Sequence, residues 1–76
     1  MIYTYDGRGE RCPVPLINLR LLLKKMTVGD KCIILISDLG SAKDIPKFLN
    51  KAGFNYHRNN IGNGIIELIV NSFANP

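Results

Sequence analysis

A cysteine followed by two closely spaced prolines is the stretch of this sequence best suited to chemistry. The run is Arg11-Cys12-Pro13-Val14-Pro15, and an apolar segment with helical spacing follows it. Proline fits the first turn of a helix because the N–H that it lacks would have no partner there, whereas the residue before a proline is pushed toward extended backbone. We therefore expect Pro13 and Pro15 to fix the start of a helix and Cys12 to lie just outside it.

The sulfur of Cys12 is expected to be exposed and to be reactive as a thiolate. A helix N-terminus carries partial positive charge, and Arg11 and Arg8 add positive charge close to the cysteine in sequence. Both effects favour the thiolate, which is the nucleophilic form of cysteine. The alternative is a structural cysteine buried beside a proline turn. We favour a reactive sulfur over a structural one because the proline pair, the helix start and the arginines occur together.

The other residues that could do chemistry have simpler interpretations. Cys32 opens the buried-strand pattern Cys-Ile-Ile-Leu-Ile and is expected to be structural. The helix between the two cysteines spans about 18 Å for about 12 residues, whereas a disulfide needs Cα atoms within about 7 Å, so no Cys12–Cys32 bridge is expected. His57 is the single histidine and has no clustered ligand, so we expect neither a metal nor a cofactor, and no base for Cys12.

Composition limits the classes of protein to consider. The chain has 76 residues, a net charge of +4 and 46% hydrophobic residues, which predicts one folded domain over residues 1–76. The mild excess of positive charge favours acidic partners or RNA without choosing between them. Two cysteines are too few for a disulfide scaffold, and neither a signal sequence nor a run of about 20 apolar residues is present. We expect a cytoplasmic protein without membrane insertion.

Hydrophobic periodicity predicts four strands and two helices. Alternation and short apolar runs place strands, and repeats at i, i+3 and i+7 place helices whose apolar stripes face a core. Asp38 or Ser41 can cap the second helix, Pro46 lies within it, and Gly53 ends it. The predicted strands are Ile2–Asp6, Lys31–Ser37, Phe54–Asn60 and Ile65–Val70, the predicted helices are Val14–Met26 and Ala42–Ala52, and residues 72–76 are a predicted frayed tail. The predicted helix stripes are Leu16, Ile17, Leu19, Leu22, Leu23 and Met26 in the first helix and Ile45, Phe48, Leu49 and Ala52 in the second.

The order β-α-β-α-β-β predicts an α+β fold. A strand–helix–strand crossover makes the first two strands parallel, and Asn63-Gly64 predicts a hairpin between the last two. Both helices must then cover one face of a four-stranded mixed sheet, giving a two-layer sandwich. The other face of the sheet stays open and carries residues such as Glu67.

Two blocks of sequence resemble the TusA/SirA family of small sulfur carriers. The pattern Asp-x-x-Gly-x-x-Cys-Pro-x-Pro is met by Asp6, Gly9, Cys12, Pro13 and Pro15. A second block, an Asp followed six positions later by Asp-Ile-Pro, is met by Asp38, Asp44, Ile45 and Pro46. The chain differs from the family at Arg8 and Glu10, where apolar residues are usual, and at Leu39, where a proline is usual.

The resemblance implies a sulfur relay in which Cys12 carries sulfur as a persulfide. It implies a cysteine desulfurase or a rhodanese-like protein as donor, a second protein as acceptor, and tRNA thiolation as one pathway served. Arg11, Pro13, Pro15, Asp38 and Asp44 would support Cys12. A nucleophile without a base, metal or cofactor is a sulfurtransferase-type carrier rather than a self-sufficient enzyme.

Two other functions remain open. One is a partner that handles thiosulfate for a membrane transporter. The other is an RNA-binding or regulatory module, since the expected fold resembles the C-terminal domain of a translation initiation factor and the chain is basic.

Overall fold

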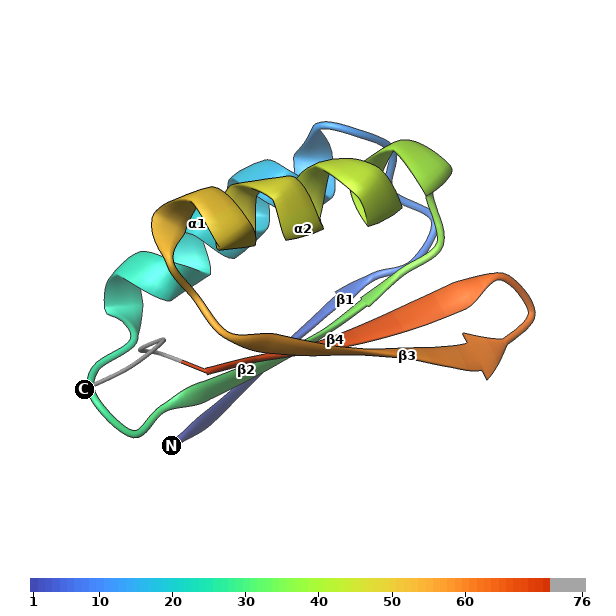
Figure 1. The fold of residues 1–76 in the computed structure, drawn as a ribbon. Helices are drawn as coiled ribbons and strands as arrows, with labels where there is room; N and C mark the ends of the chain where they lie inside the picture. Colours follow the sequence, from blue (N-terminus) through green and yellow to red (C-terminus); the bar gives the residue numbers. More distant parts are fainter. Residues whose placement is uncertain (72–76) are drawn as a thin grey trace.

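Two helices cover one face of a four-stranded sheet in the computed structural model, which describes residues 1–71 (Figure 1). This is the predicted α+β sandwich, and its element order β-α-β-α-β-β is confirmed. The predicted tail at residues 72–76 lies outside the described residues. The elements are β1 (Ile2–Gly7), α1 (Val14–Lys25), β2 (Lys31–Ile36), α2 (Leu39–Ala52), β3 (Tyr56–Gly62) and β4 (Ile65–Asn71).

The sheet has the order β1-β2-β4-β3, so the two strands richest in β-branched residues lie at its centre. β1 and β2 are parallel, as predicted, and both other pairs are antiparallel. Side chains alternate across the sheet, with Ile34, Ile36 and Leu68 fully buried under the helices and Glu67 on the open face. β3 begins at Tyr56, two residues later than predicted.

The hairpin between β3 and β4 turns at Asn63-Gly64, as predicted. Both residues have positive φ, 55° and 72°, which is the backbone that a two-residue turn between twisted strands requires. Asn tolerates this conformation better than most residues, and Gly adopts it freely.

The first helix buries a narrower stripe than the sequence predicts. Leu19 and Leu23 are buried against the sheet, whereas Ile17, expected to widen the stripe, is 50% exposed. Leu21 is also on the outer side, 55% exposed. The reason is that the neighbouring α2 and the sheet together cover only one side of the helix, so one apolar strip of α1 faces solvent.

The second helix begins three residues earlier than predicted and carries its proline well inside. Asp38 caps it by accepting the N–H of Ser41 at 2.9 Å, and Leu39 is its first residue. Gly53 ends it in the left-handed conformation, as predicted. Ala52, expected on the buried face, is exposed because the helix ends there.

Pro46 lacks the N–H that would bond to the carbonyl of Ala42 within the helix. The sequence interpretation requires the regular hydrogen bonds of α2 to begin late. Instead, the helix begins at Leu39, well before Pro46. Nη1 of Arg58 on β3 reaches the carbonyl of Ala42 at 3.4 Å. A residue of the sheet therefore supplies the donor that the helix has lost. Neither helix of the described chain is long and apolar enough to cross a membrane.

Candidate functional site

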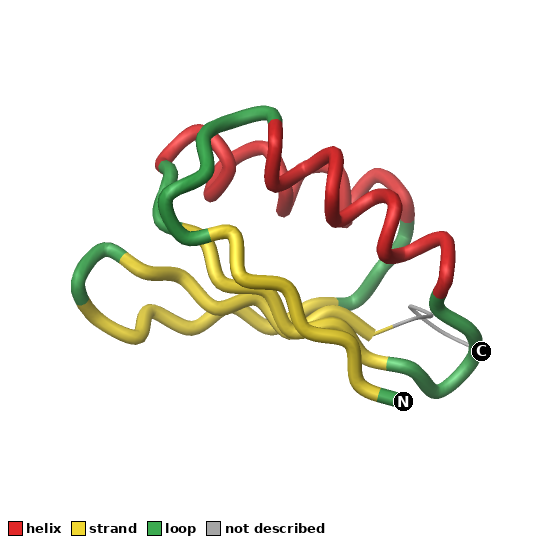
Figure 2. Tube along the Cα trace, turned by 180° about the vertical axis from the view of Figure 1, so that it is seen from behind, coloured by secondary structure: helices red, strands yellow, loops and turns green. Residues whose placement is uncertain are grey.

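The loop between β1 and α1 places Cys12 at the end of the molecule where both helices begin. Figure 2 shows the loop before α1 and the connection into α2 side by side at this end. Pro13 is the N-cap of α1 and Pro15 lies in its first turn, as predicted, and Pro15 is buried. Cys12 is exposed and precedes the helix, also as predicted, and the Cys12–Pro13 peptide bond is cis.

Asp38 ties the cysteine loop to the second helix. Its Oδ2 accepts the backbone N–H of Cys12 at 3.1 Å and the N–H of Ser41 at 2.9 Å. One carboxylate therefore caps α2 and holds the backbone that carries the sulfur. These backbone donors, aided by the positive charge of Arg11, lower the pKa of Asp38.

Gly40 lets the two segments approach this closely. A Cβ at this position would lie 3.2 Å from the Cβ of Cys12 and 3.1 Å from Oδ2 of Asp38. Any larger residue would push the loop away from the first turn of α2. Sequence reasoning missed Gly40, because a glycine in a turn before a helix carries no sign of a neighbour 28 positions away.

Three further hydrogen bonds hold the rest of the loop. The N–H of Gly9 donates to Oγ of Ser37 at 2.9 Å. The hydroxyl of Tyr5 on β1 donates to Oε1 of Glu10, and Nδ2 of Asn18 on α1 donates to the same hydroxyl at 2.8 Å. Glu10, one of the positions that departs from the family pattern, thus ties the loop to Tyr5 on β1 and, through the Tyr5 hydroxyl, to α1.

The charge around the sulfur is opposite to the one that the sequence predicts. Sγ of Cys12 donates to Oδ2 of Asp44 at 3.1 Å. This hydrogen bond, followed by desolvation and the charges of Asp44 and Asp38, raises the pKa of the Cys12 thiol. The expectation of an acidified sulfur is therefore wrong for this geometry, and the resting form is the protonated thiol.

The two arginines expected to favour the thiolate interact with carboxylates instead. Arg8 binds Asp6 through Nε and Nη2, each at 2.8 Å, and lowers the pKa of Asp6 to about 2. Arg11 acts on Asp38 rather than on the sulfur. Leu39, another departure from the family pattern, is 78% exposed at the start of α2.

The remaining candidates lie apart from Cys12. Cys32 is fully buried, as predicted, and burial raises the pKa of its thiol to about 11. Both cysteines are free thiols. His57 is exposed and pairs with Ile69 on the open side of the sheet, opposite the helices. Within residues 1–71, no three His, Cys, Asp or Glu side chains gather as they would around a metal.

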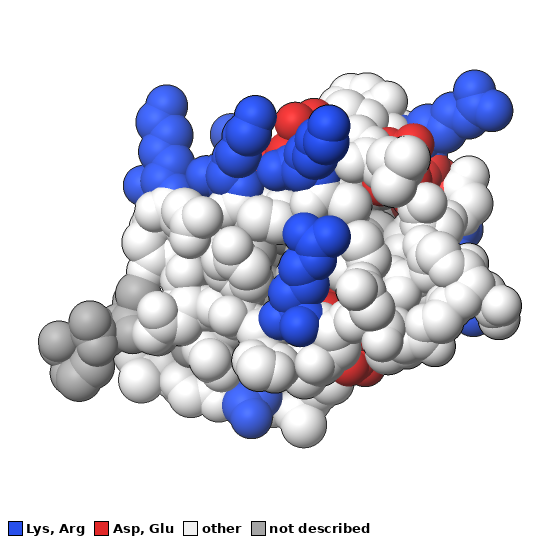
Figure 3. All heavy atoms as spheres, turned by 45° about the vertical axis from the view of Figure 1, so that its right-hand side comes forward, with Lys and Arg blue, Asp and Glu red and all other residues white. Residues whose placement is uncertain are grey.

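An apolar strip with positive charge beside it runs along α1 from the cysteine. Val14, Ile17 and Leu21 are 43%, 50% and 55% exposed and follow one another at helical spacing. Basic side chains project from the helix layer (Figure 3).

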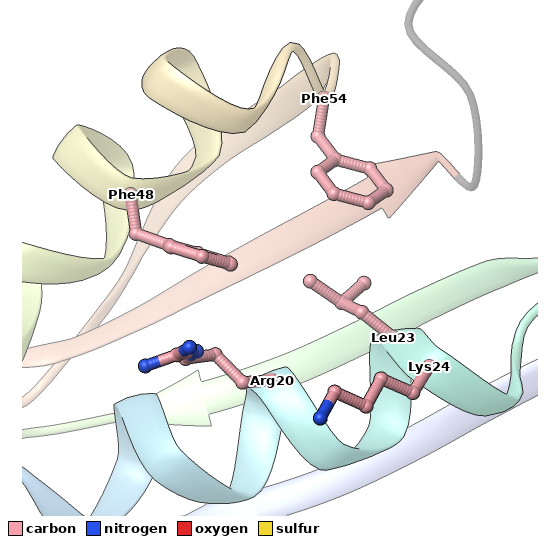
Figure 4. A pocket seen from close by; sticks show the side chains of 5 residues that line it. All are labelled: Arg20, Leu23, Lys24, Phe48 and Phe54. Carbon is pink, nitrogen blue, oxygen red and sulfur yellow. The ribbon is translucent and has the colours of Figure 1, made fainter.

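A hollow of about 230 Å³ opens beside this strip, between the two helices. Figure 4 shows the ring of Phe48 from α2 and the side chain of Leu23 from α1 pointing toward one another, with Phe54 beyond them and Lys24 along α1. The guanidinium of Arg20 lies 5.5 Å from the centre of the Phe48 ring, within the range of a cation–π contact. The helix layer therefore offers apolar and basic groups together.

The fold and the site together define a small α+β sandwich that presents one exposed cysteine where its two helices begin. The family model described as Sulfurtransferase TusA matches residues 3–72. The chain therefore belongs to the TusA family of sulfur carriers, as the sequence motifs predicted.

The chain is similar to two known proteins. It is 48% identical over 48 residues to a protein of Archaeoglobus fulgidus named "Putative sulfur carrier protein", a match that spans 63% of this chain and 66% of that protein. Its fold is similar to the crystal structure of a SirA-like protein from Desulfitobacterium hafniense, with a TM-score of 0.80 and 27% identity over 92% of this chain and 95% of that one.

Proposed function

We propose that this protein carries sulfur as a persulfide on Cys12, between a donor protein and an acceptor protein. The observation that supports this most directly is the exposed thiol of Cys12 on a backbone held by Asp38. A carrier needs a sulfur that another protein can reach and a loop that keeps it in one place. The buried Cys32 offers neither.

The loading step is an exchange of one sulfur atom without net oxidation. Sγ of Cys12 attacks the outer sulfur of the donor's persulfide, and an S–S bond forms as the donor's own S–S bond breaks. The donor cysteine leaves as a thiolate and takes up the proton that Cys12 gives up. Transfer to the acceptor is the same exchange in the other direction, with Cys12 restored as the thiol.

The partners are proteins that supply and use this sulfur. A cysteine desulfurase or a rhodanese-like protein is the proposed donor, and the acceptor determines the pathway, of which tRNA thiolation is one. We place the exchange in the cytoplasm, where thiols stay reduced.

The strip formed by Val14, Ile17 and Leu21 is the proposed contact surface for these partners. It begins two residues after Cys12, and exposed apolar residues that lie together mark protein contacts more often than isolated ones do. Arg20 and Lys24 beside it would meet acidic groups on the partner.

Incubation with a cysteine desulfurase and cysteine, followed by intact mass spectrometry without reductant, tests the function. The wild-type protein should gain the mass of one sulfur atom, and a reductant should remove it. Cys32→Ser, which leaves the exposed cysteine in place, should gain the same mass.

Cys12→Ala is the decisive variant because it removes the proposed carrier atom. It should gain no sulfur. A wild-type protein that gains none with either class of donor, or a Cys12→Ala variant that gains as much as the wild type, contradicts the proposal.

A further inference from the structure

Within residues 1–71, no cation forms an ion pair with the carboxylate nearest to the proposed carrier sulfur. Oδ2 of Asp44 lies 3.1 Å from Sγ of Cys12. The ion pairs within residues 1–71 join Arg8 to Asp6 and the N-terminal ammonium to Asp30, so neither involves Asp44. Asp44 is half-buried in the second turn of α2, which keeps its carboxylate beside the sulfur.

The other charges around Cys12 do not cancel this one. Asp38 adds a second carboxylate from the start of α2, and both acidic groups act on the sulfur. Arg11 acts on Asp38. The immediate surroundings of the sulfur are therefore negative, although the whole chain has a net charge of +4.

On the basis of the proposed function, we propose that Asp44 is a specificity-determining residue for sulfur transfer at Cys12. Its carboxylate favours reactants that bring positive charge to the sulfur. A reactant with a lysine or arginine beside its own reacting sulfur can neutralise Asp44 as it approaches. The carboxylate then binds the thiol proton less strongly, and Cys12 attacks the reacting sulfur while its proton passes to the leaving thiolate. A reactant with an acidic group at that place is repelled.

Loading itself changes the contact. The S–H of Cys12 becomes an S–S bond, so Sγ no longer has a proton to donate to Asp44. An outer sulfur that ionises would then face the negative charge of Asp44 at short range.

Two small disulfides test the charge preference without any donor protein. Cystamine carries positive charge and dithiodiglycolate carries negative charge. Each reacts by one exchange, in which Cys12 forms a mixed disulfide and one half of the reagent leaves as a thiol. Rates are measured by intact mass at low ionic strength and divided by those of a peptide of residues 8–16, which cancels the different leaving groups.

After this correction, the wild-type protein should react faster with cystamine than with dithiodiglycolate, although its net positive charge attracts anions. A unit charge about 6 Å from the carboxylate changes each rate about three-fold in water, so Asp44→Asn should lower the ratio of the two rates about ten-fold. Glu67→Gln is the matched control, since it removes the same charge from the open face of the sheet and should leave the ratio unchanged.

The pH dependence of alkylation gives a second readout. With iodoacetamide, which is neutral, Asp44→Asn should react faster than the wild type at pH 7, and its pH–rate midpoint should move to lower pH. A ratio of the cystamine rate to the dithiodiglycolate rate that stays the same in Asp44→Asn, or that falls equally in Glu67→Gln, overturns the proposal.

Two further measurements separate a failure of the charge preference from a failure of the proposed function: the salt dependence of the rates and the sulfur-loading experiment. If Asp44→Asn does not fold, the wild-type ratio is followed as salt is added. After division by the peptide rates, this ratio should fall toward one, and a ratio that does not change with salt overturns the proposal. Failure of Cys12 to accept sulfur from either class of donor would contradict the carrier function while leaving the charge preference as measured.

Discussion

Two carboxylates, one at the N-cap of α2 and one within the helix, have different roles at the cysteine. Asp38 binds backbone N–H groups, those of Cys12 and Ser41, and so fixes where the loop lies. Asp44, nearly two turns further along the helix, contacts the sulfur itself. Position and reactivity of the thiol are therefore set by different residues, and substitutions can separate the two.

Replacing Asp38 by Ala should destabilise the fold at pH 7, because the helix cap and the loop anchor are both lost. The folded state lowers the pKa of Asp38 below its ordinary value of 3.8. Its contribution is therefore complete above that pH and is lost as the pH falls through the folded pKa. Urea unfolding at pH 7 and pH 3 should show the gap between wild type and variant shrinking in acid.

Asp38→Asn is the matched control for this titration. It keeps an oxygen that can accept the N–H groups but carries no proton-binding group, so its stability should vary less with pH than that of the wild type. An Asp38→Ala gap that is equally large at both pH values would contradict this account of the carboxylate.

At the scale of elements, the inner part of α2 depends on a residue of the sheet. Pro46 leaves the carbonyl of Ala42 without its helical partner, and Arg58 supplies a donor from β3. This contact joins the helix layer to an edge strand, beyond the apolar contacts of the core. It also fixes one side of the helix whose first turn holds the cysteine loop.

Arg58→Met should cost about 1 kcal/mol of unfolding free energy, because it keeps an apolar stem but removes the donor. In a Pro46→Ala background, residue 46 can donate its own N–H to Ala42, and the cost of Arg58→Met should largely disappear. A double-mutant cycle by urea unfolding measures this coupling. Equal costs in the two backgrounds would show that Arg58 acts elsewhere.

At the scale of the molecule, the two layers leave different surfaces to solvent. The helix layer carries the cysteine, the strip of Val14, Ile17 and Leu21, and basic side chains. The opposite face of the sheet carries Glu67 and His57. The chemistry proposed for Cys12 thus lies on the same side as the exposed apolar residues.

Ile17→Glu should slow sulfur loading from a desulfurase about ten-fold, because it places an acidic group in the middle of the proposed contact strip. Its alkylation by iodoacetamide should stay close to that of the wild type, since the sulfur and its neighbours are unchanged. Ile2→Glu is the control, because Ile2 is 63% exposed on β1, away from α1. Loading that is slowed equally by both substitutions would argue against the strip.

Much of the architecture follows from local pattern. Alternation and helical spacing predict the six elements, and the sequence identifies the Asn63-Gly64 turn, the Gly53 helix end and the start of α1 at the prolines. These features depend on residues within a few positions of one another. The errors that depend on distant neighbours are the exposure of Ile17 and the charge around Cys12.

The sequence by itself determined that Cys12 lies exposed at the start of a helix, because proline and helix geometry act over adjacent residues. Only the tertiary structure decided the charge that the sulfur meets. Asp38 and Asp44 are 26 and 32 residues from Cys12 along the chain, and the fold brings both to it. Electrostatic effects follow distance through space, so the arginines adjacent in sequence mattered less than two carboxylates from another helix.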